Sequence, residues 1–350
     1  MLIYYLIIAC LTYLCIFKNF STRQLSNHLH SIFPLLLLFP LIALRSDTVG
    51  TDLVAYVKEF EYARYSFENN LRGWERGYEL LLYFVHSLNL SFQFILVIIA
   101  FITLHSLHLL FKRYSSDIPL SYVIFFCFGS FAFSLSGLRQ ALAISFAIYA
   151  VLLFLDKRFL MFILFTLIGS LFHLSAIILF IVPILSVFNF SRFGASFLFA
   201  LTCVFYFFPV DSIVEALLDV EFAYIQAYAG FDDSVNPLVI LLNAMFPLFA
   251  LIMSDKSFYT NRANRLFYIF SLANLAIILV SIQLPMLSRL ALYFSIFMTV
   301  LVPNVIVSLR PIYFRSFASL FFVLLGILNF AISVPDNSIG IDQYSFMRMK

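Results

Sequence analysis

Apolar stretches, repeated along almost the whole chain, constrain the fold of this sequence more than any other feature. We find twelve of them, and most approach the length of about 20 residues that crosses a bilayer as a helix. Their bounds are 2–17, 28–44, 91–111, 119–136, 138–155, 159–172, 174–188, 194–209, 236–253, 265–283, 288–309 and 316–333. With 63% hydrophobic and only 11% charged residues, the chain has more apolar surface than one soluble core can bury. The bilayer must therefore be the solvent for most of it.

The sequence thus predicts an all-α integral membrane protein, a polytopic bundle of about 12 transmembrane helices with amphipathic external helices. We expect one membrane domain over residues 1–350, with long external loops at 45–90 and 210–235. The first apolar stretch is predicted to be a retained helix, because its positive charge, Lys18, follows the apolar run. A cleavable signal peptide carries that charge before the run.

Basic residues are unevenly shared among the connections between these stretches. Every second connection is short and basic, and together these hold 12 of the 21 Lys and Arg residues but only three of the 18 acidic ones. The positive-inside rule places these short basic connections in the cytoplasm. Both termini and the two long loops are therefore expected outside. We expect a multi-pass protein of the bacterial inner (cytoplasmic) membrane. The net charge of +3 without a basic stripe predicts no nucleic-acid partner.

The two long loops carry distinct patterns. Apolar residues recur at helical spacing in 210–235, which predicts an amphipathic helix lying on the surface. Segment 78–88 is too short to span the bilayer and is predicted to lie at the membrane surface. Residues Asp52 and Tyr56 fall four apart, on one face of a predicted helix.

Three ionisable residues, Arg139, His173 and Arg289, lie at the predicted external ends of apolar stretches. Arg45 ends the second stretch at the same level. A charge embedded in a membrane faces the bundle interior or a water-filled cavity by default, so we expect one cavity that opens outward. The alternatives are arginines that snorkel to lipid headgroups or pair structurally with Asp47 or Asp52, and a histidine satisfied at an interface.

The residue types at this level suit phosphate and sugar. Guanidinium groups bind phosphate oxygens bidentately, and carboxylates suit sugar hydroxyls or general-base work. Tyrosines and Trp74 offer flat faces to sugar rings. The pair His105 and His108 lacks a third metal ligand, so no metal site is predicted. Without a phosphate-binding glycine loop the sequence gives no sign of an ATPase.

Four motifs in order along the chain resemble the EpsG family, Wzy-like polytopic proteins of bacterial exopolysaccharide and O-antigen clusters. These motifs are Arg-x-Asp-x-x-Gly-x-Asp-x-x-x-Tyr (45–56), Glu-x-Gly-Tyr-Glu (75–79), Gly-Leu-Arg-Gln (137–140) and Phe-His-x-Ser-Ala (172–176). The resemblance is strongest over 40–180 and rests afterwards on the layout and on Ser288-Arg289.

The resemblance implies a polysaccharide polymerase, a membrane-embedded glycosyltransferase that uses a donor linked to undecaprenyl pyrophosphate. The growing glycan of an exopolysaccharide, capsule or O-antigen would pass to the next lipid-linked repeat unit at the outer face of the membrane. The implied partners are that lipid-linked oligosaccharide, the bilayer and a chain-length regulator, and no cofactor is implied. The catalytic candidates are Asp52, Glu79, Arg139 and His173. The substrate-binding candidates are Arg45, Asp47, Tyr56, Glu75, Gln140 and Arg289.

Two other functions fit the same layout. A flippase for lipid-linked oligosaccharides would suit twelve spans, but transporters place substrates near the midplane, often between repeated halves, and this sequence shows no repeat. A ligase that moves the finished chain to another acceptor would use the same outer cavity. The residues alone do not separate ligase from polymerase.

Overall fold

The computed structural model describes residues 1–17, 23–69, 71, 74–207, 236–255, 257–334 and 340–347. Regular secondary structure in these ranges is helical throughout, apart from one isolated antiparallel bridge between Arg45 and Phe346. The all-α prediction is confirmed. The chain divides into two compact units, Met1–Val182 with Ile312–Lys350, and Pro183–Pro311. The single membrane domain stays a prediction.

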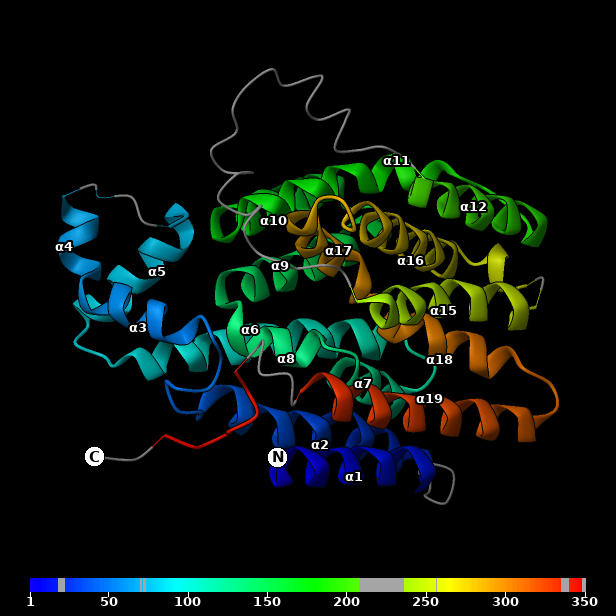
Figure 1. Ribbon diagram of the computed structural model, residues 1–350, viewed down its shortest axis with the longest axis horizontal. Helices are drawn as coiled ribbons and strands as arrows, with labels where there is room; N and C mark the ends of the chain where they lie inside the picture. The colour runs from blue at the N-terminus through cyan, green and yellow to red at the C-terminus, as the bar shows by residue number, and fades with distance from the viewer. Residues whose placement is uncertain are drawn as a thin grey trace. The chain divides into compact units, whose positions relative to one another are not determined.

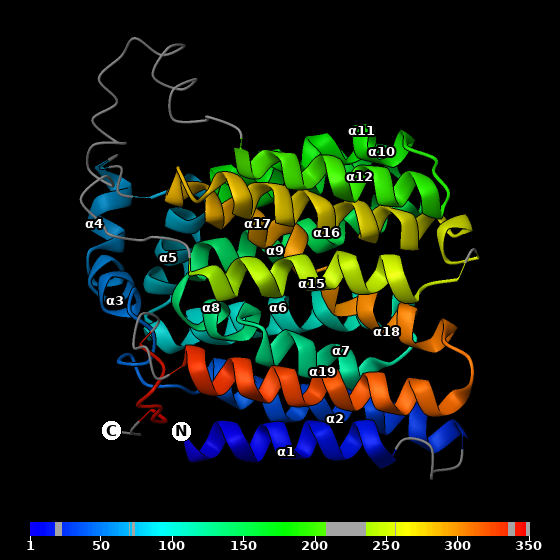
Figure 2. The ribbon, with the colours of Figure 1, turned by 45° about the vertical axis from the view of Figure 1, so that its right-hand side comes forward.

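The first unit contains most of the predicted site residues, and its long helices run side by side (Figures 1 and 2). Helix α9 packs against α6 and α10, α2 packs against α6, and both α1 and α19 pack against α7. The helices of this unit are α1 (Leu2–Phe17), α2 (Arg23–Ala43), α3 (Leu53–Glu61), α4 (Ala63–Glu68), α5 (Arg76–Ser87), α6 (Phe92–Tyr114), α7 (Ile118–Cys127), α8 (Ser130–Ser136), α9 (Leu138–Leu155), α10 (Phe159–Phe172), η2 (Leu174–Ile181) and α19 (Ile312–Ser333).

The second unit begins within α11 (Val182–Val187) and contains the remaining described helices. Asparagine pairs join them: Asn274 Nδ2 donates to Asn243 Oδ1 over 2.6 Å, and Asn304 Nδ2 donates to Asn264 Oδ1 over 2.9 Å. Such amide pairs hold apolar helices together where water is absent. The helices are α12 (Arg192–Val204), η3 (Phe205–Phe207), α15 (Pro237–Met253), η4 (Phe258–Thr260), α16 (Arg262–Val280), η5 (Pro285–Leu287), α17 (Ser288–Ser295) and α18 (Met298–Ser308).

Among the described residues, four helices are long and apolar enough to cross a membrane: α6, α9, α16 and Tyr313–Ser333 of α19. The pairs α7–α8 and α17–α18 are bent by 56° and 44°, and the count rises to six if each pair is one span. Gly129, with φ of 92°, makes the first of these breaks. The other predicted stretches coincide with apolar helices of 10–17 residues. The helical nature of these segments is confirmed, and about twelve spans stays a prediction.

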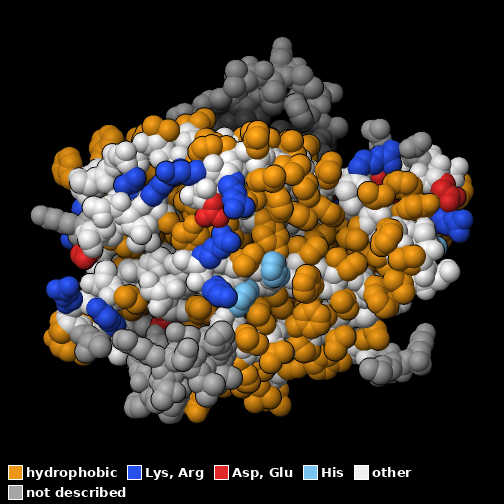
Figure 3. Space-filling view, turned by 180° about the vertical axis from the view of Figure 1, so that it is seen from behind, with side chains coloured by type: hydrophobic (Ala, Val, Ile, Leu, Met, Phe, Trp, Pro, Cys, Tyr) orange, Lys and Arg blue, Asp and Glu red, His pale blue; other side chains and the backbone are white. Residues whose placement is uncertain are grey.

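Large apolar side chains on the surface agree with a lipid environment. Leu160, Phe193 and Phe317 are 82%, 85% and 70% exposed. Orange apolar side chains cover much of the face in Figure 3. A monomeric soluble protein rarely exposes contiguous apolar surface on this scale. The chain is therefore a membrane protein by the character of its surface as well as by its helices.

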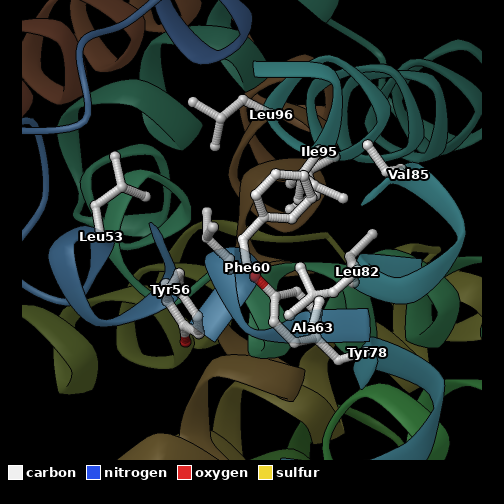
Figure 4. Packing of buried hydrophobic residues seen from close by; sticks show 12 residues of the cluster. Leu53, Tyr56, Phe60, Ala63, Tyr78, Leu82, Val85, Ile95 and Leu96 are labelled. Carbon is white, nitrogen blue, oxygen red and sulfur yellow. The ribbon is translucent and has the colours of Figure 1, made fainter. Parts of the chain in front are cut away.

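The helices α3 and α5 pack over the start of α6 through a buried apolar cluster (Figure 4). Tyr56 and Phe60 of α3 meet Tyr78 and Leu82 of α5 there, above Ile95 of α6. On its other side, α5 exposes apolar residues four apart, namely Leu80, Phe84 and Leu88. The predicted short helix at 78–88 is thus observed as α5, and its lying on the membrane stays a prediction. The amphipathic helix predicted in 210–235 falls outside the described residues.

One end of the first unit gathers the segments that the charge pattern assigns to the outside. The helices α3, α4 and α5 lie there, as do both ends of the chain (Figures 1 and 2). The Met1 amino group donates to the Asp342 carbonyl over 3.4 Å. At the C-terminal ends of α6 and α9, Arg113 forms an ion pair with Asp156, at 2.9 Å. External termini and the inner membrane stay predictions.

Candidate functional site

Glu79 shapes the turn that enters α5. One carboxylate oxygen accepts the Trp74 backbone N–H at 3.2 Å, and the other accepts from Arg76 at 3.1 Å. A carboxylate near a helix N-terminus is favoured by the helix dipole and by unpaired N–H groups. Only 7% of the Glu79 side chain is exposed. Glu79 therefore holds Trp74 and Glu75 at the N-terminal end of α5.

The glycine of the same motif, Gly77, lies where a side chain has no room. A Cβ at this position would lie 2.7 Å from the Leu171 carbonyl oxygen. The first turn of α5 consequently approaches the last turn of α10 backbone to backbone. This close approach brings Glu75 next to His173, which follows α10 directly.

Arg139 is the centre of the site. It lies in the first turn of α9, where the helix dipole disfavours a positive charge, so its position needs specific partners. Its guanidinium forms an ion pair with Glu75, and the guanidinium carbon lies 3.8 Å from the centroid of the Trp74 ring. The Tyr56 hydroxyl is also hydrogen-bonded to the Arg139 side chain. A cation over an indole face gains electrostatic attraction from the ring.

His173 joins the same group from the other side. It ends α10 and begins η2, with extended backbone (φ −155°, ψ 117°). Its Nδ1 lies 2.7 Å from Ser175 Oγ and 4.0 Å from Glu75 Oε1. The Leu174 N–H donates to that same carboxylate oxygen over 3.4 Å. We call Tyr56, Trp74, Glu75, Arg139 and His173 the Arg139 cluster.

Aromatic rings form the floor of the Arg139 cluster. The Tyr56 ring lies 5.5 Å from both the Trp74 and the Tyr78 ring centroids. Burial raises the pKa of Tyr56, and the hydrogen bond from Arg139 opposes this shift. Burial also raises the pKa of Tyr78 well above its ordinary value. Both phenols are therefore neutral at physiological pH and supply hydrogen bonds, not charge.

Several polar atoms at this floor are buried without a hydrogen-bond partner among the described residues. They are Trp74 Nε1, Arg139 Nε and the Tyr78 hydroxyl. Buried donors are nearly always satisfied in folded proteins, by the protein, by water or by a ligand. Together with the ion pair, these atoms give the cluster spare capacity for oxygen-rich substrates.

Arg45 has different surroundings. Its side chain is fully buried and donates to two backbone carbonyls, Ile42 in the last turn of α2 and Leu135 in the last turn of α8, the latter at 2.9 Å. Carbonyls at helix C-termini are unpaired and carry partial negative charge, which suits a guanidinium. Burial lowers the pKa of Arg45 to about 10, so the group stays charged at neutral pH. Its part in substrate binding stays a prediction.

The loop after Arg45 is held by the C-terminal segment 340–347. The Ser46 N–H donates to the Ser345 carbonyl, and the Gly50 N–H donates to the Gly340 carbonyl, both at 2.9 Å. Gly50 has φ of 110°, and a Cβ there would lie 2.6 Å from the Leu135 carbonyl oxygen. We call Arg45, this loop (44–51) and the C-terminal segment the Arg45 clamp.

Asp52 leaves the clamp and begins α3. Its N–H donates to Ser136 Oγ over 3.3 Å, while its side chain is exposed and makes no capping bond. Asp52 lies one turn before Tyr56 and acts on the pKa of that phenol. It is consequently an exposed carboxylate close to the Arg139 cluster.

The other predicted site residues lie apart or in the second unit. Asp47 is exposed and accepts a hydrogen bond from Ser46 at 3.0 Å. Gln140 is buried in α9, with 3% exposure. Arg289 is exposed in α17 of the second unit, so its sharing of one cavity with Arg139 stays a prediction. In the part of the chain that the structure describes, no group of three or more metal-ligating side chains occurs.

Sequence reasoning did not assign two residues of this site. Trp74 was expected only as a flat face for sugars, yet it lies directly under Arg139. Ser175 was part of a motif without a role, yet it contacts the His173 ring. A serine two residues after a histidine that caps a helix is the signal that was available for the second.

Comparison with known proteins identifies the family of the chain. Neither a search of curated proteins nor a search of solved structures returned a match. The family model described as the EpsG family matches residues 28–346, nearly the whole chain. Its match begins in α2 and ends at Phe346, the residue that pairs with Arg45, so it includes both the clamp and the cluster. The chain belongs to the EpsG family.

Proposed function

We propose that the chain is a polysaccharide polymerase that transfers a growing glycan from undecaprenyl pyrophosphate to the next lipid-linked repeat unit. Membership in the EpsG family supports a polymerase-like glycosyltransferase role. The observation that carries the proposal is the Arg139 cluster, in which a partly exposed guanidinium stands between a carboxylate, an indole and a histidine.

The reaction needs charge stabilisation more than covalent catalysis. A hydroxyl oxygen of the acceptor unit attacks the anomeric carbon of the growing chain, and the bond from that carbon to the pyrophosphate oxygen breaks. The electron pair leaves with the pyrophosphate, whose developing charge Arg139 stabilises through its remaining donors. A guanidinium suits this task because it stays charged and binds phosphate oxygens in a fixed fork.

The acceptor hydroxyl must also lose a proton. Glu75 is engaged by Arg139, and Glu79 is engaged by Trp74 and Arg76. Asp52 is the exposed carboxylate beside the cluster and is the general base in this proposal. The partly exposed Trp74 ring provides an aromatic surface of the kind that sugar rings pack on.

The proposal sets the reaction at the outer face of the inner membrane. Two observations support it. The cluster lies at the start of α9, at the end of the first unit where Met1 contacts Asp342. The ion pair of Arg113 with Asp156 lies at the opposite, C-terminal ends of α6 and α9, where the basic connections begin. The donor would then be a lipid-linked oligosaccharide delivered in the bilayer. A chain-length regulator is the expected protein partner.

The test is Arg139→Ala in a strain that lacks the native gene, with analysis of polysaccharide length and lipid-linked intermediates. We expect loss of long chains by about 10²–10³-fold and accumulation of single repeat units on the lipid. Arg64→Ala is the matched control, because Arg64 is exposed and pairs with Glu68 on α4. Normal chain length in Arg139→Ala at normal protein abundance would refute the proposal.

The gene deletion also distinguishes the two other functions. Repeat units that accumulate inside the cell would identify a flippase. Full-length chains that stay on their lipid carrier would identify a ligase.

A further inference from the structure

The hydrogen bonds of His173 determine which of its ring nitrogens carries the proton. The Ser175 backbone N–H donates to Nδ1 over 3.4 Å. A backbone N–H has no acceptor capacity, so this contact favours a lone pair on Nδ1. The Ser175 hydroxyl lies 2.7 Å from the same nitrogen and can donate as well. Two contacts from one residue therefore leave the proton of the neutral ring on Nε2.

The Glu75 carboxylate does not draw the proton of the neutral His173 ring to Nδ1. Its Oε1 lies 4.0 Å from Nδ1, which is beyond hydrogen-bond distance. One carboxylate oxygen already pairs with Arg139, and the other accepts the Leu174 N–H. A proton on Nδ1 would face the Ser175 N–H, so the imidazolium loses a favourable contact that the neutral ring has.

We propose that His173 is a hydrogen-bond donor in the transfer reaction, acting through Nε2–H, and that Ser175 is the positioning residue that fixes this polarity. The inference rests on the proposed polymerase function and deepens it. A ring whose Nε2 carries the proton does not accept one there, so His173 is not the general base. Its N–H donates to an oxygen of the sugar–pyrophosphate linkage and stabilises the charge that develops there.

With His173 as a donor, the proton of the acceptor hydroxyl is taken up by the Asp52 carboxylate. The acceptor oxygen bonds to the anomeric carbon, and its proton passes to Asp52. The carbon–oxygen bond to pyrophosphate breaks, and the oxygen that leaves is stabilised by Arg139 and by His173 Nε2–H. His173 keeps its proton throughout the step.

The first experiment observes the ring directly and needs no activity. Protein labelled with ¹³C and ¹⁵N in histidine is reconstituted in lipid and studied by solid-state NMR, with His173→Gln identifying the signal among the six histidines. We expect a neutral ring protonated at Nε2 at the pH where polymer forms. A ring protonated at Nδ1, or an imidazolium, would overturn the proposal. Failure of the polymerase assay in the wild type would instead overturn the proposed function.

The second experiment separates donor from base. Glutamine places an amide N–H near the position of Nε2, so His173→Gln should retain activity within about tenfold of the wild type. His173→Ala should lose about 10²–10³-fold. The acidic limb of the pH–rate profile should stay in place in His173→Gln. Equal inactivity of both variants at normal abundance, or loss of the acidic limb in the glutamine variant, would show that His173 is the base.

The third experiment tests the positioning role of Ser175 by removing and restoring its hydroxyl group. Ser175→Ala keeps the backbone N–H but loses the Oγ donor, so activity should fall about three- to tenfold and the NMR signal should show a mixture of ring forms. Ser175→Thr restores the hydroxyl and should restore both readouts. An unchanged ring signal in Ser175→Ala would refute the positioning role.

Discussion

Arg45 and Arg139 belong to the first and third motifs and lie at the same end of the first unit, yet their guanidinium groups have different surroundings. Arg45 is fully buried, and its two terminal guanidinium nitrogens donate to backbone carbonyls at the ends of two helices. Arg139 is 17% exposed and meets a carboxylate, an indole and a phenol. Backbone carbonyls exist in every sequence, whereas the partners of Arg139 are the side chains of Tyr56 and Glu75, from two other motifs, and of Trp74, which directly precedes Glu75.

This contrast separates two kinds of arginine in a membrane protein. The Arg45 clamp joins α2, α8 and the C-terminal segment, so its charge works as a structural cross-link. Both arginines leave Nε without a hydrogen-bond partner among the described residues, but only Arg139 is partly exposed, and Trp74 Nε1 adds a second unpaired donor beside it. We therefore expect substitutions in the clamp to act on folding and those in the cluster to act on transfer.

The largest expected effect is on the stability of Arg45→Ala. The substitution leaves two helix-end carbonyls without a donor and opens a cavity, which should cost about 3–5 kcal/mol of unfolding free energy. The measurement is thermal unfolding of purified protein in detergent, with Arg64→Ala expected to stay within about 0.5 kcal/mol of the wild type. A stable but inactive Arg45→Ala would move Arg45 from the clamp to the substrate site.

Gly50→Ala should have the next largest effect. Gly50 has φ of 110°, and the new Cβ would lie 2.6 Å from the Leu135 carbonyl oxygen. We expect a loss of about 2–3 kcal/mol from backbone strain and overpacking together. Gly129→Ala is the matched control, because φ there is also positive but nothing lies within 4 Å of the new Cβ. Its cost should be about 1–2 kcal/mol, from the conformation alone. Equal losses in the two variants would show that the contact with Leu135 does not matter.

The sequence predicts the helices well, because apolar runs and flanking Lys and Arg are local signals. The predicted stretches 138–155 and 159–172 match α9 and α10 residue for residue. The roles of Arg45 and Glu79 were beyond such reasoning. The carbonyl that binds Arg45 belongs to Leu135, 90 residues away, and the Glu79 carboxylate turns back to a backbone N–H. Both partners are backbone groups, which are the same in nearly every residue, so the residue types do not reveal them.

Glu75→Gln tests whether the ion pair of the cluster serves transfer. The amide keeps an acceptor for Arg139 but loses the charge, so polymerisation should fall about tenfold while the protein stays folded. Glu68→Gln removes the charge from an exposed pair with Arg64 at 3.0 Å and should leave chain length unchanged. The measurement is the length distribution of the polysaccharide at matched protein abundance. Unfolding of Glu75→Gln to the extent of Arg45→Ala would make the cluster a second structural clamp.

Trp74→Phe has the smallest expected effect. It separates two roles of the Trp74 side chain, namely support of Arg139 by the ring and hydrogen bonding to substrate by Nε1–H. Phenylalanine keeps an aromatic face for Arg139 but weakens the attraction, by about 0.5–1 kcal/mol. It also removes Nε1–H, a buried donor without a partner in the described chain, and that loss alone does not destabilise the folded protein. Unfolding free energy should therefore change little, while polymerisation falls about three- to tenfold if Nε1–H binds substrate oxygen. Unfolding in denaturant and polysaccharide length, measured on the same variant, give the two values. Lower stability with unchanged chain length would make Trp74 a support for Arg139 only, as the carbonyls of Ile42 and Leu135 are for Arg45.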